Sequence, residues 1–134
     1  MMIQTAMLEL QTKMFERLSS DPTLLAKIEG VFDAVEEDQL HPYITIGEPT
    51  MVPFTTKNKF GEELVIVIHS WSVYAGKKES YEILNLCLAS LRVQLGLSGF
   101  ILRKVVVENI TVIDDVDPRI KHGILRMKYT IQNN

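Results

Sequence analysis

The stretch that most constrains the fold is ELVIVIHSWSVY, residues 63–74, which carries the strongest strand pattern in the chain. Successive residues of a strand point to opposite faces of a sheet, so the odd-numbered residues share one face and the even-numbered residues share the other. The first half is apolar on both faces, and we therefore expect both faces to be covered. His69 and Trp71 are expected to face the core, His69 as a partly buried, hydrogen-bonded histidine. Ser70 and Ser72 would leave the other face weakly polar.

The segment HPYITIGEPTMVPF, residues 41–54, predicts an edge strand. Its prolines cannot donate hydrogen bonds to a neighbouring strand, and prolines in sheets are confined to edges, strand starts and bulges. The polar residues and glycine of TTKNKFGE, residues 55–62, are typical of a hairpin loop. The pattern therefore predicts a hairpin between residues 41–54 and 63–74, with one exposed edge.

Two stretches repeat their apolar residues at steps of three and four, the period of an amphipathic helix: residues 3–19 and 79–96. At ~1.5 Å per residue the second helix would be roughly 27 Å long, enough to lie across a small sheet. Asp21 is a suitable N-cap for a short helix over residues 22–29. Further strands are expected over residues 31–35, 100–114 and 123–131.

The order of these elements predicts an α+β fold, with a single antiparallel β-sheet packed by an N-terminal helix and a long central helix. A length of 134 residues fits one domain, spanning residues 1–134. The formal net charge of −3, from 14 basic and 17 acidic residues, argues against a surface that binds duplex nucleic acid. No run approaches the ~18 apolar residues needed to span a bilayer, so no membrane partner is expected.

Residues that could carry chemistry are few and lack partners in the sequence. His41, His69 and His122 have no ligand-like spacing, and His41 and His122 are expected in solvated turns. Cys87 falls on the apolar stripe of the long helix, where a thiol is most often a small buried hydrophobe. The acidic run that begins at Asp114 lacks the glycine and the glutamate of a calcium loop. We therefore expect no catalytic residue, no cofactor and no metal site, and the chain is not predicted to be an enzyme.

The residues alone leave two other functions open. Tyr43, Glu48 and His69 would surround a pocket in a small-molecule-binding or hydrolytic domain, provided that their strands bring them together. Alternatively, an adaptor would bind a peptide along the open edge of the sheet through main-chain hydrogen bonds. Both alternatives depend on a geometry that the sequence does not determine.

Four segments and a Leu-rich helix form a recognisable series. The segments are GVFDAV (30–35), HPYITIGE (41–48), VIVIHSWSVYAG (65–76) and HGILRMKYTI (122–131). Together they resemble the tail-completion proteins of long-tailed bacteriophages, also called tail terminator or tail-to-head joining proteins. The resemblance covers nearly the whole chain, and its best marker is the Pro-Tyr-apolar-x-apolar-Gly element from Pro42 to Gly47. One departure follows the first short strand, where the family often has a proline and this chain has Glu36, with an acidic extension to Asp38.

The resemblance implies a structural virion protein without catalytic residues. It implies a ring of six copies that caps the finished tail tube and docks it to the head connector, with DNA passing through the ring without specific binding. The implied partners are further copies of the chain, the tail tube protein and the head connector. The implied location is the head–tail interface of a virion assembled in the bacterial cytoplasm. A mildly acidic protein suits this role, because it lets a polyanion slide through rather than holding it.

Closure of such a ring needs a heterologous interface between two different patches of the subunit. Exposed sheet edges invite pairing with another chain, so we expect the edge strand and the loop after it to contribute assembly contacts. The residues of this predicted interface are Tyr43, Met51, Phe54, Thr55, Thr56, Lys57, Asn58, Lys59, Phe60 and Glu62.

Overall fold

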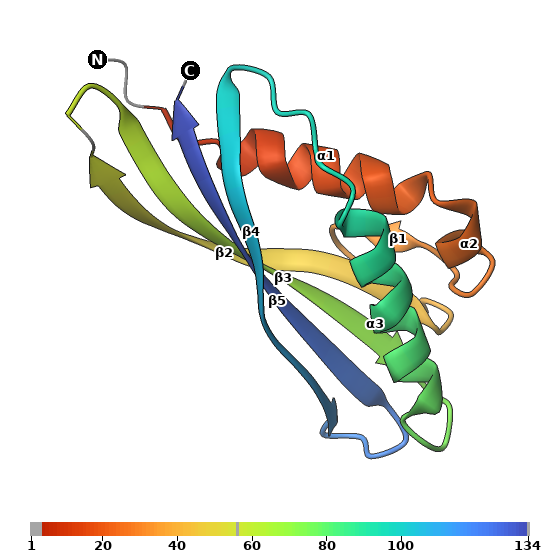
Figure 1. Cartoon of the computed structure of the whole chain (residues 1–134). Helices are drawn as coiled ribbons and strands as arrows, with labels where there is room; N and C mark the ends of the chain where they lie inside the picture. Colours follow the sequence, from red (N-terminus) through yellow and green to blue (C-terminus); the bar gives the residue numbers. More distant parts are fainter. Residues whose placement is uncertain (1–3, 56, 134) are drawn as a thin grey trace.

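The computed structural model describes residues 4–55 and 57–133, which form an α+β fold with helices on one face of a single sheet (Figure 1). The elements are α1 (Met7–Ser19), α2 (Pro22–Leu25), β1 (Val31–Phe32), β2 (Tyr43–Thr55), β3 (Phe60–Ser72), α3 (Lys78–Leu91), β4 (Phe100–Asp114) and β5 (Lys121–Asn133). The predicted fold class is confirmed, with α1 and α3 as the N-terminal and central packing helices.

The sheet has five strands in the order β1-β2-β3-β5-β4. The central strand, β3, pairs antiparallel with β2 on one side and with β5 on the other, and β4 pairs antiparallel with β5 at one edge. β1 runs parallel to β2 through the pairs Val31↔Ile44 and Phe32↔Thr45, so the sheet is mixed rather than purely antiparallel. β1 and β2 are parallel because the connection over residues 33–42 brings the chain back to the end of the sheet where β1 begins. Both strands then run in the same direction.

The predicted elements are present, and several of their ends differ. The strand over residues 100–114 has the predicted bounds, and Asp21 caps α2 by accepting hydrogen bonds from two backbone N–H groups. α2 ends at Leu25 because the chain turns toward the sheet, where the Glu29 N–H donates to the Pro42 carbonyl at 2.7 Å. α3 is also shorter than predicted. β3 begins at Phe60 and ends at Ser72, so both of its ends lie earlier in the chain than the predicted strand over residues 63–74. β5 extends beyond both of its predicted ends, because its pairing with β3 continues beyond the apolar alternation.

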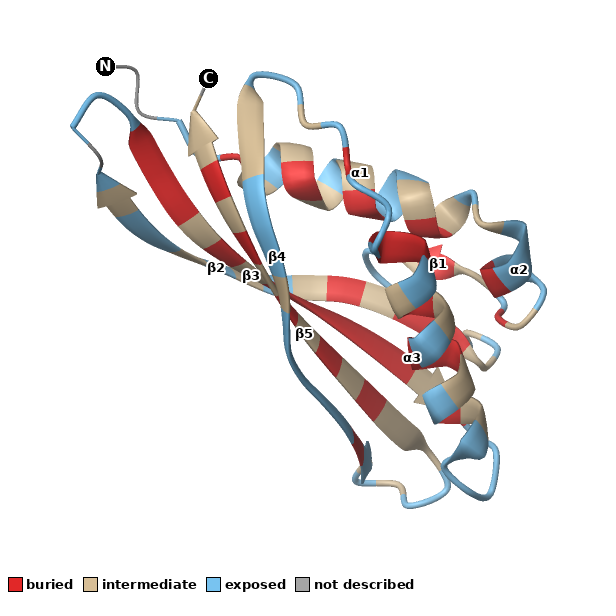
Figure 2. Ribbon diagram, in the orientation of Figure 1, coloured by how far each residue is buried: buried red, intermediate tan, exposed pale blue. Residues whose placement is uncertain are grey.

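The helices pack on the even-numbered face of β3, so the prediction that His69 and Trp71 face the helix-covered core was wrong. Figure 2 shows the buried residues concentrated on β3, on β5 and on the helices that lie over them. Ser70 and Ser72 are fully buried, and Ser72 Oγ donates to Glu79 Oε1 of α3 at 2.6 Å. The serines therefore do not form a free polar surface. Their small side chains let α3 approach the sheet closely.

Gly123 of β5 is essential to this close approach. A Cβ atom at this position would lie 3.0 Å from Leu84 Cδ1 of α3 and closer still to Ser70 Oγ of β3. Leu84 and Ser70 are both almost completely buried, so neither has open space into which it can move. The absence of a side chain at Gly123 thus sets the distance between α3 and the sheet.

We expect Gly123→Ala to lower the free energy of unfolding by about 1–3 kcal/mol, because the added methyl group overpacks the contact between α3 and the sheet. Urea unfolding followed by the fluorescence of Trp71, the single tryptophan, measures this change. Gly47→Ala is the matched control, since a Cβ atom at Gly47 meets nothing within 4 Å. Equal stability of the two variants would contradict this account of the packing.

Candidate assembly interface

The predicted interface residues lie along β2 and the turn into β3, and the structure separates them by exposure. The exposed members are Thr55, Lys57, Asn58 and Lys59. The half-buried members are Met51 and Phe54. The buried members are Tyr43, Phe60 and Glu62. Thr56 lies outside the described residues. The exposed members of the predicted interface therefore lie at the tip of the hairpin and at the end of β2, while the buried members pack within the fold.

β2 has an open edge beyond its bulge. β1 pairs with it only at Ile44 and Thr45, and within the described residues no strand pairs with residues 48–55 on that side. The register with β3 shifts between Gly47 and Thr50, where the strand is irregular. The predicted edge is thus confirmed for the second half of β2.

Glu62 caps α1 from within the fold. Its side chain is fully buried. Oε2 accepts a hydrogen bond from the Ala6 N–H at 3.0 Å, and Oε1 accepts a hydrogen bond from the Thr5 hydroxyl at 2.6 Å. The first N–H groups of a helix lack partners within the helix, and the helix dipole favours a negative charge beside them. Glu62 therefore fastens the N-terminal helix to the hairpin, which is a role in folding.

We expect Glu62→Ala to lower the free energy of unfolding by about 1–3 kcal/mol, because it leaves the buried Ala6 N–H without an acceptor. The control is Glu63→Ala, which removes an ion pair with Lys128 at 3.1 Å on the surface and should cost less than about 1 kcal/mol. Thermal and urea unfolding measure both variants. If Glu62→Ala were as stable as Glu63→Ala, the cap would not contribute to the fold.

The outer face of the sheet carries an aromatic cluster drawn from β2, β3 and β5. Trp71 stacks on His122 with ring centroids 3.9 Å apart and on Tyr43 with centroids 6.3 Å apart. Nε2 of His122 lies 2.6 Å from Nδ1 of His69, whose Nε2 contacts Oε1 of Glu48 at 3.2 Å. The hydrogen-bonded role predicted for His69 is confirmed. The solvated turn predicted for His122 was wrong, because β5 begins before this histidine and pairs it with Trp71.

The residues of the pocket hypothesis do converge. Tyr43, Glu48 and His69 line one cleft of about 470 Å³, together with Trp71 and His122. Glu48 reaches this cleft from the bulge of β2, where its backbone adopts a left-handed φ of 52°. The residues that line the cleft include no serine or cysteine nucleophile, and in the described parts of the chain no group of three or more His, Cys, Asp or Glu side chains could hold a metal. The cluster joins a carboxylate and two imidazoles by polar contacts, and it links three strands.

His122 gives the cluster a pH dependence. Burial and the neighbouring His69 hold the pKa of His122 below its usual value of 6.5. Asp115 and Glu48 act in the opposite direction but do not outweigh them. The folded chain therefore binds a proton here less readily than the unfolded chain. The stability that this group contributes is complete above about pH 6.5 and is lost as the pH falls through the folded pKa.

We expect His122→Gln to reduce the loss of unfolding free energy between about pH 7 and pH 5, because the variant has no imidazole to protonate at this position. Urea unfolding at a series of pH values measures the effect. His41→Gln is the control, since it also removes one histidine but leaves the pair of His69 and His122 in place. Superimposable pH profiles for the wild type and His122→Gln would contradict the prediction.

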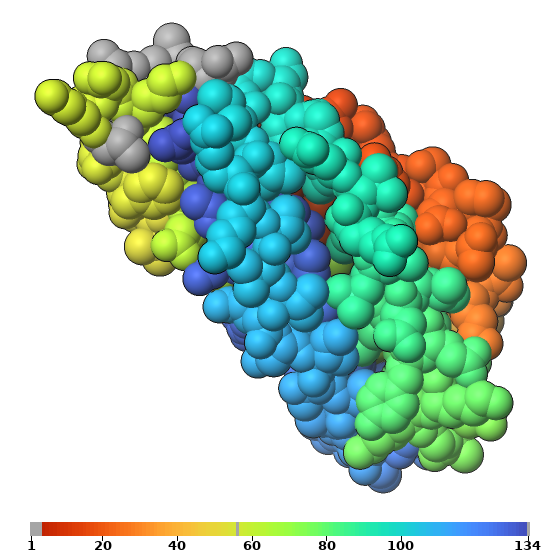
Figure 3. Space-filling view, viewed as in Figure 1, coloured from red at the N-terminus to blue at the C-terminus, as the bar shows by residue number. Residues whose placement is uncertain are grey.

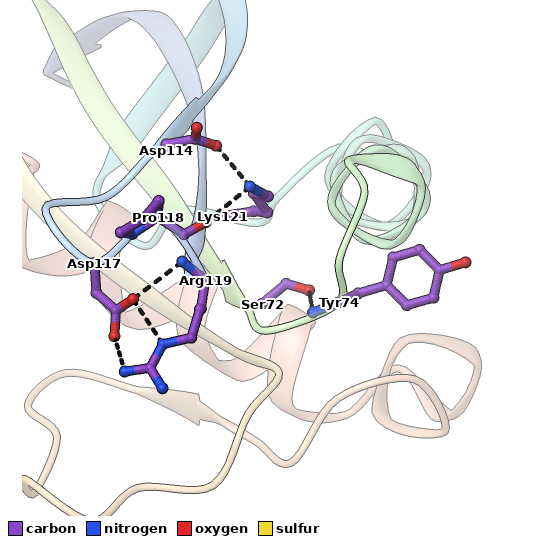
Figure 4. Close-up of polar contacts among 7 residues, drawn as sticks. All are labelled: Ser72, Tyr74, Asp114, Asp117, Pro118, Arg119 and Lys121. Carbon is purple, nitrogen blue, oxygen red and sulfur yellow. Dashed lines mark hydrogen bonds and ion pairs between the residues drawn. The ribbon is translucent and has the colours of Figure 1, made fainter.

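In the acidic turn between β4 and β5, basic side chains from the same stretch of chain pair with two of the carboxylates (Figure 4). Lys121 Nζ donates to Asp114 Oδ1 at 2.8 Å and to the Pro118 carbonyl at 2.9 Å. Arg119 donates to both carboxylate oxygens of Asp117, with the shorter bond at 2.7 Å. These hydrogen bonds from Arg119 lower the pKa of Asp117 to about 2. The carboxylates of Asp114 and Asp117 are thus both engaged in ion pairs.

Cys87 is fully buried in α3, as predicted, and burial raises the pKa of its thiol to about 12. A thiol with so high a pKa remains protonated at neutral pH and is a poor nucleophile. Among the helices of the described residues, none is long and apolar enough to cross a membrane.

Comparisons with known proteins agree with this fold and with the sequence resemblance. A chain from the virion of a native gene transfer agent particle superposes with a TM-score of 0.87 over 98% of this chain and all of that chain; at 19% identity, this likeness shows the fold alone. Tail completion protein gp17 of Bacillus phage SPP1 is 33% identical over 128 residues, which cover 93% of each protein. The solved structure of the SPP1 protein covers 95% of this chain and 91% of its own, with 30% identity and a TM-score of 0.66.

The family described as tail completion protein gp17 matches residues 12–132. The chain is therefore a structural protein of phage tails and a component of the virion. It belongs to the tail completion protein gp17 family. The family and the virion location predicted from the sequence are confirmed.

Proposed function

We propose that six copies of this chain form a ring that caps the tail tube and joins the tail to the head connector. The ring contacts the tail tube protein on one side and the head connector on the other, and DNA passes through it without specific binding. The subunits assemble in the cytoplasm of the host bacterium, and the ring lies at the head–tail interface of the virion. The family's name, tail completion protein, and the match over residues 12–132 support this role.

The observation that carries the proposal is that one sheet has two different open edges on opposite sides. The first is the part of β2 over residues 48–55. The second is β4, a strand of 15 residues on which Val105, Val107 and Ile110 remain exposed. An unpaired edge with exposed apolar residues tends to associate with another chain. Two unlike edges can meet head to tail, which is the kind of contact that closes a ring.

The tip of the β2–β3 hairpin is the second part of the proposed assembly surface. Lys57, Asn58 and Lys59 are exposed there, and Thr55 adds an exposed side chain at the end of β2. The hairpin projects from one end of the sheet, beyond α1 and α3 (Figure 1). It is therefore placed to reach a neighbouring subunit, the tube or the connector. The net charge of −3 on the whole chain is compatible with passage of DNA through the ring.

Phage that lack this chain should accumulate separate heads and tails in electron micrographs, and wild-type chain should restore joined particles. Lys57→Glu should reduce the yield of joined particles at least about tenfold, because it reverses a charge at the hairpin tip. Lys77→Glu, an equal change at an exposed site beyond the other end of β3, is the control and should join particles normally. Joined particles formed without any copy of this chain would disprove the proposed function.

A further inference from the structure

A groove with an apolar floor lies between the C-terminal end of α3 and the first half of β4 (Figure 3). Its volume is about 420 Å³. Val105 and Val107 of β4 pair with Tyr129 and Met127 of β5 and therefore share their face of the sheet, yet α3 does not cover them. Val105 is 41% exposed and Val107 is 45% exposed. The groove is thus an apolar strip of the helix-bearing face that the subunit leaves open.

The lining of the groove includes one polar group without a partner. Tyr129 is fully buried, and within the described residues its hydroxyl makes no hydrogen bond. Buried polar groups are nearly always satisfied, and leaving one unpaired is costly. The hydroxyl is also closed to solvent, so an occupant of the groove meets the apolar side chains around it rather than this oxygen.

The rim of the groove is basic. Arg92, Arg103 and Lys104 line it and are exposed. In the part of the chain that the structure describes, none of the three contacts a carboxylate; Arg103 donates to the neutral Gln132 at 2.8 Å. Because the chain as a whole is acidic, this cluster of unpaired cations is a local feature. It favours an acidic occupant.

An acidic segment of matching composition lies beside the opposite edge of the sheet. Glu36, Glu37 and Asp38 follow β1, are exposed, and have no side-chain hydrogen bond or ion pair within the described residues. Val35 and Leu40 flank them and are also exposed, Leu40 by 68%. β1 and β4 are the two outer strands of the sheet, so the segment and the groove lie on opposite sides of one subunit.

We propose that residues 35–40 of one copy dock into the groove between α3 and β4 of the next copy. This inference rests on the proposed ring and names one of its subunit contacts. The carboxylates of Glu36 and Glu37 meet Arg92 and Lys104, while the apolar side chains that flank the acidic residues cover the exposed apolar floor. The contact joins two different patches on opposite sides of the subunit, as a head-to-tail ring requires.

Two charge-reversed variants test this contact. Glu36→Lys/Glu37→Lys places cations opposite the basic rim, and Arg92→Glu/Lys104→Glu places anions opposite the acidic segment. Each variant alone should raise the concentration needed for ring formation at least about tenfold, because like charges then face each other at every contact. Native mass spectrometry of the full chain, alone and in the presence of isolated tails, measures ring formation.

An equimolar mixture of the two variants should form rings again, with the variants alternating. In the mixture, the introduced lysines of Glu36→Lys/Glu37→Lys meet the introduced glutamates of Arg92→Glu/Lys104→Glu. At the next contact around the ring, the unchanged acidic segment of Arg92→Glu/Lys104→Glu meets the unchanged basic groove of Glu36→Lys/Glu37→Lys. Alternation closes only in a ring with an even number of copies, as the proposed six-membered ring has. Glu16→Lys/Glu29→Lys makes the same change of net charge as Glu36→Lys/Glu37→Lys at two other exposed sites, one on α1 and one in the connection between α2 and β1, and should assemble like the wild type.

The outcomes separate this contact from the proposed function. Rings formed by the wild type and by both variants at the same concentration would overturn the contact and leave the proposed ring intact. The contact is also overturned, and the proposed ring left intact, if neither variant forms rings and their equimolar mixture forms none either, while the Glu16→Lys/Glu29→Lys control does form rings. If the wild type forms no ring, either alone or on tails, the proposed function fails and this contact fails with it. Circular dichroism of each variant verifies that it is folded.

Discussion

The close contact of α3 with the centre of the sheet determines how the rest of this chain is arranged. Gly123, Ser70 and Leu84 meet where β5, β3 and α3 come together, and the absence of a side chain at Gly123 lets the helix lie low on the sheet. The small, buried serines at the end of β3 contribute to the same approach. Because α3 is held over β3 and β5, it does not reach across β4. The exposed strip on β4 is thus a consequence of the packing at the centre.

Within the described residues, no helix covers the outer face of the sheet, and side-chain contacts on that face stabilise it instead. Trp71 stacks between Tyr43 and His122, and the hydrogen-bonded row of Glu48, His69 and His122 crosses from β2 to β5. Stacked rings bury apolar area while their nitrogen atoms keep polar partners. The same residues that suggest a pocket from the sequence therefore also have a structural explanation, which requires no substrate.

Much of the fold follows from the sequence, because alternation and helical periodicity are local properties. The strand over residues 100–114 and the capping of α2 by Asp21 are predicted by such patterns and are confirmed. The prediction for the face of β3 that meets the helices was wrong. The apolar half of this strand is equally apolar on both sides, so only Trp71 and the serines distinguish the faces; in the folded chain, the contact at Gly123 requires small residues beneath α3.

The site is harder to predict than the fold because it depends on register and on which edges remain unpaired. The alternation of β5 begins after His122 and therefore indicates a turn there; only the pairing of His122 with Trp71 places it in the cluster. Glu62 has the sequence context of a loop residue, yet it is buried because β3 begins at Phe60 and its carboxylate reaches the start of α1. A strand's hydrophobic pattern does not show what approaches it from a distant part of the chain.

Charge also explains how β4 can remain an open edge without unspecific aggregation. Charged side chains on an edge strand oppose pairing with other strands, and β4 carries Arg103 and Lys104 beside its exposed valines. In the proposed ring, these cations admit an acidic segment and repel basic ones, so the same residues protect the free subunit and select its neighbour. The acidic extension from Glu36 to Asp38 would then be the part of this chain that is matched to its own groove. On this argument, the specificity of assembly lies in the charges at the rim, and the apolar floor contributes affinity once the correct segment has entered.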